Sequence, residues 1–294
     1  MKFNLCVDAR LCLSETPIWD DRLGQLYWTD TLGGIVHRYD PATGDDTSWK
    51  TGQPVGSAIP CSDPNFMLCA LEDGLYLLNL SSGTLTFVSN PETRPGFRYN
   101  DTRVDAAGRI FTSSVSTLYG SPEYREEITG KFYMIDTDGS ISVIAPAVNQ
   151  YNGIVWNRDN TKMFVVDTYF QKLLVFPFSL STVPSASEAI SIDVSPFGMP
   201  DGISINEEDE LFLCHWSGKI SHWRKQLQLE SLIPFPVEYP CCGGFGGTNK
   251  KCFYVASSAF QYTPVDFERN PGAGGIFEAA CRVPGCLDHF YPVR

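Results

Sequence analysis

Short apolar segments recur along the chain, and tight polar turns separate them. The first copy covers residues 26–30 and 33–40, and a turn at 41–44 follows it. Equivalent segments begin at residues 26, 67, 110, 163, 211 and 253, so the steps are 41, 43, 53, 48 and 42 residues. A period of this size, with several short strands in each copy, is typical of a propeller blade. The pattern predicts an all-β fold, a six-bladed β-propeller that forms a single domain over residues 1–294.

Two other β and α/β architectures fit the pattern less well. A β-sandwich would not repeat the same hairpin six times, and no helical periodicity of 10–15 residues points to βαβ units. The third repeat is the longest, and its extra residues 119–129 predict a protruding loop of the kind that often covers a site. We expect the N-terminal segment 3–12 to close the ring with the last blade by pairing near residues 287–293.

A polar residue lies 10 or 11 positions before the start of four of the repeating strands. These residues are Glu15, Asn100, Asn152 and Asp201. Residues at the same place in each repeat occupy equivalent places around a ring of similar blades. We therefore expect all four side chains at one end of the central channel. Two carboxylates and two amides that converge on one point resemble a cation site with oxygen ligands. No histidine or cysteine is frequent at this phase, and a site for a soft metal is therefore not favoured.

The remaining two blades have uncharged residues at the same phase. Blade two has Ser57 or Ala58, and blade six has Cys241 or Cys242. We expect these positions to leave room for a substrate. A simpler interpretation stays open for the polar residues, because Asn-Asp, Asn-Gly and Asp-Gly are ordinary turn dipeptides.

Charge and composition exclude several classes of partner. Hydrophobic residues make up 43% of the chain, as in a globular protein, and the net charge is −12. An acidic surface repels phosphate backbones and anionic membranes, so we expect neither nucleic acid nor membrane as a partner. The N-terminus lacks the apolar stretch of a signal peptide, which predicts a cytoplasmic protein, and we expect it to be a monomer. The ten cysteines are then expected to be reduced thiols.

The segments around these polar residues resemble those of a known family. They occur in order and at blade spacing: Ser14-Glu15-Thr16-Pro17-Ile18-Trp19, Arg98-Tyr99-Asn100-Asp101, Asn152-Gly153-Ile154-Val155-Trp156, Pro200-Asp201-Gly202, Gly243-Gly244-Phe245-Gly246-Gly247 and Ala273-Gly274-Gly275-Ile276-Phe277. Together they are similar to the regucalcin (senescence marker protein)/gluconolactonase family of six-bladed propellers, of the sugar lactone lactonase type. The resemblance covers nearly the whole chain.

The resemblance implies roles for five residues. Glu15, Asn152 and Asp201 would coordinate a divalent metal ion, and Asp201 would also act as the catalytic general base. Asn100 would contact the substrate or a metal-bound water, and Arg98 would hydrogen-bond the sugar lactone. The oxygen ligands favour Ca²⁺, with Zn²⁺, Mn²⁺ and Mg²⁺ as alternatives.

The chain departs from the family at three places. Tyr151 replaces the Ser or Thr that commonly precedes the fourth-blade Asn, and Thr102 replaces a Gly. The loop 118–129 does not match, so no acidic substrate contact is carried over to it. These differences bear on the identity of the substrate rather than on the metal site.

Two further features have structural interpretations. His215, beside Trp216 in the fifth repeat, could face the channel, but a packed or hydrogen-bonded histidine is the commoner case. The glycine run 243–247 has no following Lys-Ser/Thr and is therefore not a phosphate-binding loop. We expect it to let a strand of blade six approach its neighbours.

The sequence thus predicts a metal-dependent hydrolase that opens a small-molecule sugar lactone (an aldonolactone) to the sugar acid. A divalent cation would polarise the carbonyl group and activate water. Two alternatives remain: a calcium-binding regulatory protein without significant catalysis, and a different metal-dependent esterase or phosphotriesterase on the same propeller.

Overall fold

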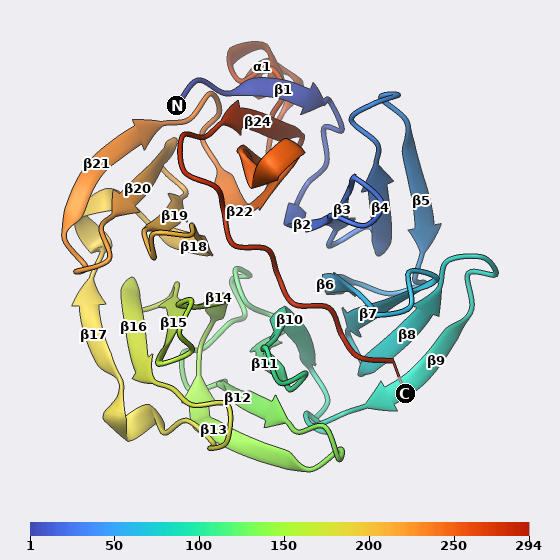
Figure 1. The fold of residues 1–294 in the computed structure, drawn as a ribbon, viewed down its shortest axis with the longest axis vertical. Coiled ribbons are helices and arrows are strands. Elements are labelled where there is room, and N and C mark those ends of the chain that lie inside the picture. Colours follow the sequence, from blue (N-terminus) through green and yellow to red (C-terminus); the bar gives the residue numbers. More distant parts are fainter. Residues whose placement is uncertain (294) are drawn as a thin grey trace.

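The computed structural model describes residues 1–293, which form six four-stranded antiparallel sheets around a central axis (Figure 1). The predicted six-bladed β-propeller is confirmed. The first three blades consist of β2 (Ser14–Asp20), β3 (Gln25–Asp30), β4 (Ile35–Tyr39) and β5 (Asp46–Lys50); β6 (Val55–Pro60), β7 (Phe66–Leu71), β8 (Leu75–Asn79) and β9 (Leu85–Ser89); and β10 (Phe97–Val104), β11 (Ile110–Ser116), β12 (Gly130–Ile135) and β13 (Ile141–Val148).

The other three blades follow the same order from the axis outward. They consist of β14 (Tyr151–Trp156), β15 (Lys162–Asp167), β16 (Lys172–Pro177) and β17 (Ile190–Asp193); β18 (Pro200–Ile205), β19 (Leu211–His215), β20 (Lys219–Trp223) and β21 (Leu229–Pro234); and β22 (Pro240–Gly246), β23 (Cys252–Ser257), β24 (Ile276–Ala280) and β1 (Asn4–Val7). Among the described residues the helical elements are short: α1 (Pro264–Arg269) and three 3₁₀ turns at Ala186–Glu188, Ser195–Phe197 and Thr248–Lys250.

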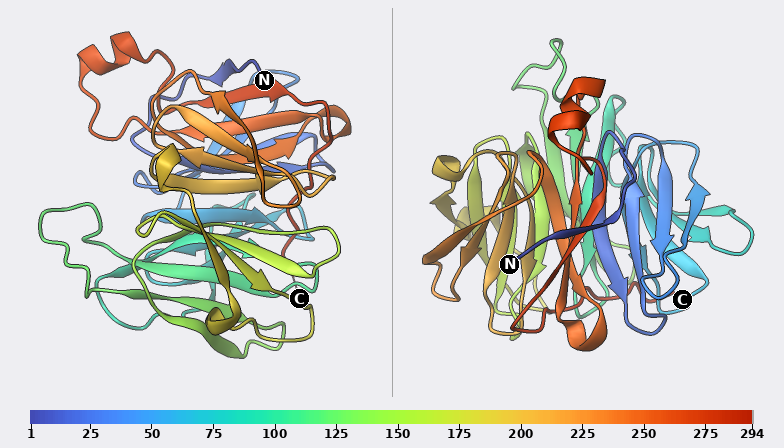
Figure 2. Two further views of the ribbon diagram at one scale, coloured as in Figure 1. Left: turned by 90° about the vertical axis from the view of Figure 1, so that its left-hand side faces the viewer. Right: turned by 90° about the horizontal axis from the view of Figure 1, so that it is seen from above.

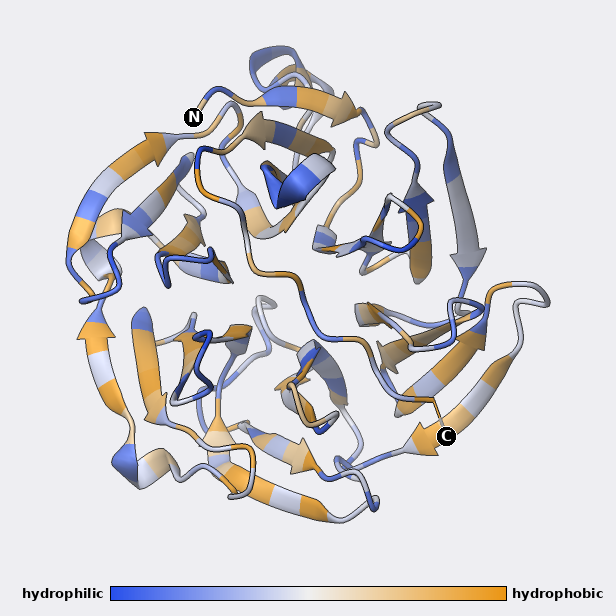
Figure 3. Cartoon of the chain, viewed as in Figure 1, coloured by the Kyte–Doolittle hydropathy of each residue, from blue (hydrophilic) through white to orange (hydrophobic). Residues whose placement is uncertain are grey.

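Burial decreases from the axis to the rim of each blade. All six residues of β6 and of β18 are buried, whereas four of the five residues of the outer strand β5 are exposed. Apolar residues concentrate in the strands and hydrophilic ones in the turns (Figure 3). The buried clusters join neighbouring blades, as where Phe111 and Phe132 of blade three pack with Phe176 of blade four. Each such buried aromatic side chain stabilises the ring by about 1.5–3 kcal/mol.

The ring is closed by a strand from the start of the chain. β1 pairs with β24 in an antiparallel register that sets Asn4 opposite Glu278. The last blade therefore combines three strands from the C-terminal part with one from the N-terminus. The partner expected from the sequence, near residues 287–293, was wrong. Those residues are not a strand of the blade because they leave the last sheet and run across one face of the ring (Figure 1).

This C-terminal segment, residues 281–293, is called the strap below. Its Cys286 N–H donates to the carbonyl oxygen of Ile205 at 3.0 Å, at the end of the innermost strand of blade five. Its Tyr291 N–H donates to the carbonyl oxygen of Pro60 at 3.0 Å, at the end of the innermost strand of blade two. The strap therefore connects opposite sides of the ring and covers one end of the channel (Figure 1).

Every innermost strand has a register irregularity in its pairing with the next strand. The shifts lie between Glu15 and Ile18, Val55 and Ser57, Tyr99 and Thr102, Asn152 and Ile154, Pro200 and Ile203, and Pro240 and Cys242. A bulge bends its strand and redirects the side chains beside it. The repeat places all six bulges at the same end of the channel, away from the strap.

Gly244 shows how closely the glycine run of β22 approaches blade one. A Cβ atom at this position would lie 1.9 Å from the carbonyl oxygen of Pro17, a backbone atom that cannot rotate away. We therefore expect Gly244→Ala to lower the free energy of unfolding by about 1–3 kcal/mol, as overpacking does in dense cores. Urea denaturation followed by tryptophan fluorescence measures this loss. Gly74→Ala is the control, because its Cβ would meet its nearest atoms at 3.2 Å and should cost less.

No helix in residues 1–293 is long and apolar enough to cross a lipid bilayer.

Candidate metal and substrate site

A pocket of about 520 Å³ opens at the end of the channel opposite the strap. Its lining includes residues of every blade, among them Glu15, Gly56, Asn152, Asp201 and Phe260. The helix α1 and the loop 117–129 both project on one side of the ring, whereas the strap lies on the other (Figure 2). Residues of this loop line the pocket, so the loop predicted from the long third repeat does protrude beside a cavity.

All five residues singled out by the sequence line this pocket. Glu15 comes from β2, Arg98 and Asn100 from β10, Asn152 from β14, and Asp201 from β18. Each of these strands is the innermost of its blade, and each residue adjoins or lies within the bulge of its strand. The repeat phase in the sequence thus corresponds to a common position in space.

The two carboxylates converge with a thiol. Ligand atoms of Glu15, Asp201 and Cys241 all lie within 4.8 Å of one another. Cys241 lies in the bulge of β22, the innermost strand of blade six, and its side chain is buried. The sequence assigned this position only to substrate space, whereas the structure brings the Cys241 sulfur close to the two carboxylates.

The two amides are joined to each other rather than to the carboxylates. Asn100 Nδ2 donates to the side-chain oxygen of Asn152 and, at 2.9 Å, to the carbonyl oxygen of Tyr151. Asn152 Nδ2 donates to Thr168 Oγ1 at 2.7 Å. Arg98 Nη1 in turn donates to Asn100 Oδ1 at 3.1 Å. This chain of hydrogen bonds fixes the orientation of both amides on one wall of the pocket.

Burial makes the carboxylates hard to ionise together. It raises the pKa of Glu15 to about 7, with the negative charge of Asp101 adding to the rise. Burial and then the negative charge of Glu15 raise the pKa of Asp201 well above its usual range. Burial also lowers the pKa of Arg98, whose positive charge favours ionised Glu15. A cation between the two carboxylates would offset their repulsion and desolvation, so the donor set fits a divalent metal ion.

A second layer of contacts holds the carboxylates in place. Trp216 Nε1 donates to Asp201 Oδ2 at 2.8 Å, and the Cys242 thiol donates to Glu15 Oε2 at 2.9 Å. Next to Glu15, Thr16 has a φ of 46°, and its N–H donates to Cys242 Sγ at 2.8 Å. A β-branched residue rarely adopts this left-handed conformation, and such strain is concentrated at functional sites.

Aromatic side chains form the upper wall of the pocket. Tyr119 and Tyr124 of the loop 117–129 pack edge to face, with ring centroids 5.1 Å apart. Tyr124 is fixed from below, because Asn149 Nδ2 donates to its hydroxyl at 2.7 Å. On the opposite side Trp216 packs near Phe260. Apolar rings around a few convergent polar groups are typical of a small-molecule site.

His215 takes the structural role rather than the functional one. Its Nδ1 lies 3.0 Å from the carbonyl oxygen of Gly198, and its Nε2 lies 2.7 Å from Ser221 Oγ. It is fully buried, and burial lowers its pKa to about 4, so the imidazole is neutral at physiological pH. It does not line the pocket.

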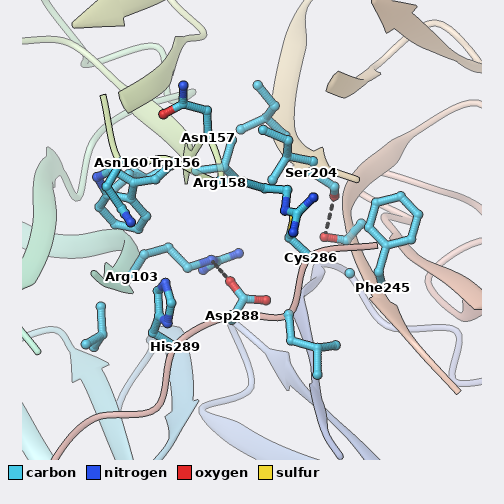
Figure 4. A pocket seen from close by; sticks show the side chains of 18 residues that line it. Arg103, Trp156, Asn157, Arg158, Asn160, Ser204, Phe245, Cys286, Asp288 and His289 are labelled. Carbon is cyan, nitrogen blue, oxygen red and sulfur yellow. Dashed lines mark hydrogen bonds and ion pairs between the residues drawn. The ribbon is translucent and has the colours of Figure 1, made fainter. Parts of the chain in front are cut away.

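Sequence reasoning missed the charged groups inside the channel. Arg103 in β10 forms ion pairs with Asp101 on the pocket side and, at 3.0 Å, with Asp288 of the strap. Figure 4 shows Arg103 and Asp288 in a second pocket of about 220 Å³, which lies beneath the strap. The only sequence signal for this network was a basic residue two positions after Asp101.

The ten cysteines are all free. Two of them, Cys241 and Cys242, contact or adjoin the carboxylates of the site.

Comparisons with known proteins identify relatives over nearly the whole chain. Residues 13–259 match the model of the SMP-30/gluconolactonase/LRE-like region. The 6-deoxy-6-sulfogluconolactonase of Pseudomonas putida is 26% identical over 95% of this chain and 94% of its own length. Regucalcin of Xenopus laevis is also 26% identical, over 95% of this chain and 94% of its own.

The fold has close structural neighbours. A calcium-binding protein, regucalcin, from Agrobacterium tumefaciens superimposes with a TM-score of 0.89 at 23% identity, over 98% of this chain and 97% of its own. The blade order, the pocket at one end of the channel and the match over residues 13–259 lead to one assignment. The chain belongs to the SMP-30/gluconolactonase family.

Proposed function

We propose that this protein is a metal-dependent lactonase that hydrolyses a sugar lactone to the sugar acid. The observation that carries the proposal is the convergence of Glu15 and Asp201 at the base of a pocket large enough for one sugar ring. The names of the relatives support the reaction class, since a sulfogluconolactonase and an L-arabinolactonase are among them.

Glu15 and Asp201 would hold the cation, with Asn152 as a further oxygen donor. A bound divalent cation supplies Lewis acidity, which polarises a carbonyl group and lowers the pKa of water. Asp201 is the general base in this proposal, and it accepts the proton of the attacking water. Trp216 supports this role, because its indole N–H holds one carboxylate oxygen and thereby fixes the orientation of the group.

Arg98 and Asn100 would bind the substrate. Arg98 is half-buried, and only one of its guanidinium nitrogens is engaged, by Asn100 Oδ1 and by the carbonyl oxygen of Tyr99. Its free N–H groups would donate to sugar hydroxyls and to the oxyanion that develops when the ester carbonyl is attacked. The rings of Tyr119 and Tyr124 would cover the apolar face of the sugar and exclude bulk water.

A pH-indicator screen of aldonolactones, run with metal and with chelator, tests the proposal. We expect acid release from at least one aldonolactone, its loss with chelator and its recovery when a divalent metal is restored. Metal binding without hydrolysis of any lactone would instead favour a calcium-binding regulatory protein. Chelator-sensitive hydrolysis of aryl esters or phosphotriesters, but not of lactones, would indicate a different hydrolase.

The raised pKa of Glu15 predicts a pH dependence of metal binding. Because the carboxyl group titrates at about 7, a cation must displace its proton below that pH. We expect metal affinity to rise as the pH increases from about 6 to about 8, by up to about tenfold per unit for each proton displaced. Isothermal titration calorimetry at the two pH values measures the change. Glu15→Gln should bind more weakly and with a flatter pH dependence, and an affinity that is constant over this range would contradict the prediction.

A further inference from the structure

The donor set of the site contains sulfur as well as oxygen. We infer that Cys241 is a ligand of the cation and that its thiol makes this site prefer zinc-like, thiophilic cations to Ca²⁺. The inference rests on the proposed metal site and specifies which ion that site selects.

The first step is the geometry. The Cys241 sulfur belongs to the same group of ligand atoms as the oxygens of Glu15 and Asp201, all within 4.8 Å of one another. A tetrahedral zinc ion with ligands at about 2.0–2.3 Å sets its ligand atoms roughly 3.3–3.8 Å apart. The three groups therefore need only small side-chain movements to share one ion.

The second step is the direction of the Cys241 side chain. Cys241 lies in the bulge between Pro240 and Cys242, and the bulge directs it to the carboxylates. Its sulfur lies 3.7 Å from the carbonyl oxygen of Tyr239 and also interacts with the side chains of Asp201 and Trp216. The neighbouring Cys242 is different, because its thiol is already held between Glu15 Oε2 and the N–H of Thr16.

The third step is the count of oxygen donors. Calcium takes about 6–8 oxygen ligands, from carboxylates, carbonyls and water. Here the side-chain oxygen of Asn152 accepts from Asn100, and that of Asn100 accepts from Arg98. Besides Asn152, whose oxygen is shared with the Asn100 amide, two carboxylates and a thiol are the candidate ligands at the base of the pocket. Thiolates are soft ligands that select zinc and related ions, whereas Ca²⁺ is hard and binds sulfur poorly.

Coordination by Cys241 would also change the charge of the site. The thiol loses its proton to solvent when the metal binds, and no electron is transferred. Two carboxylates and one thiolate then surround a 2+ ion, and Arg98 lies close enough to Glu15 to offset part of the excess negative charge.

Cobalt titration of the intact protein tests the inference, since Co²⁺ substitutes for zinc and reports its ligands by absorption. We expect a near-ultraviolet sulfur-to-cobalt charge-transfer band in the wild-type protein. The band should disappear in Cys241→Ser and in Cys241→Ala, and it should persist in Cys242→Ser, the matched neighbour. Calorimetry should show that Cys241→Ser loses at least about tenfold in zinc affinity, since disturbing even a group that supports a metal ligand typically costs that much, while Ca²⁺ affinity changes little.

The outcomes separate this inference from the proposed function. Cobalt binding without the band in the wild-type protein, or a band that survives in Cys241→Ser, would overturn the thiol ligand and leave the lactonase proposal intact. Tighter binding of Ca²⁺ than of Zn²⁺ by the wild-type protein would overturn the inferred metal preference and likewise leave that proposal standing. Failure of any divalent metal to bind the folded wild-type protein would overturn both. Circular dichroism of each variant confirms that it is folded before titration.

Discussion

Asp201→Asn is expected to reduce the kcat of lactone hydrolysis by a factor of about 10³ or more. A positioned general base contributes about 10²–10⁴ to a rate, and Asp201 would also lose its negative charge toward the cation. The amide has the same shape, and its oxygen can still accept the hydrogen bond from Trp216. The pocket should therefore keep its form while the chemistry is lost. Steady-state kinetics at saturating metal measures the effect.

Asp167→Asn is the matched control for this prediction. Asp167 is also a buried carboxylate with a raised pKa, of about 6, but it lies at the end of β15 and does not line the pocket. We expect this variant to keep its turnover. An Asp201→Asn protein that binds metal and turns over lactone at the wild-type rate would show that another group removes the proton.

Arg103→Met is expected to lower the free energy of unfolding by about 3–5 kcal/mol. The Arg103 side chain is 4% exposed and lies between Asp101, at 7%, and Asp288, at 24%. Without the guanidinium group two carboxylates would face each other inside the channel with no cation between them. Removing one partner of a buried ion pair leaves an uncompensated charge, which is far more costly than losing a surface pair. Urea denaturation measures the loss.

Two further variants make the Arg103 prediction specific. Arg103→Met combined with Asp288→Asn should recover part of the lost stability, because one of the two unpaired charges is then removed. Lys172→Met breaks an exposed pair with Asp193 and should change stability by less than about 1 kcal/mol. A loss below about 1 kcal/mol for Arg103→Met would mean that water or rearranged side chains compensate the carboxylates.

Much of the fold could be predicted because each propeller blade repeats the same pattern of apolar strands and polar turns along the sequence. Each repeat must bury its faces against its neighbours, so the same apolar pattern returns at strand starts such as Leu26 and Leu211. The partner of β1 could not be read in this way. Its four residues carry no signal that identifies their partner strand. The strap was an alternative partner at a similar distance along the sequence.

The site was predictable to the extent that residues at the same place in each repeat lie at the same end of the channel. That reasoning brought Glu15, Asn152 and Asp201 to one end of the channel, where the structure has them. It did not identify Cys241 as a member of the cluster, because a cysteine in a buried strand is usually a small apolar residue. The bulge between Pro240 and Cys242 decides where that sulfur points, and no sequence pattern marked the bulge.

The pairing of β1 with β24 also determines the order in which the molecule can be completed. Asn4 is synthesised well before its partner Glu278, because more than nine-tenths of the 294 residues lie between the two. During that interval blades one to five can each form from local hairpins, whereas blade six cannot. Until β24 is made, the nascent protein is an open arc in which β1 is unpaired, and such edges recruit other chains. Closure of the ring therefore comes last, and the unpaired edges stay available for association with other chains until that step.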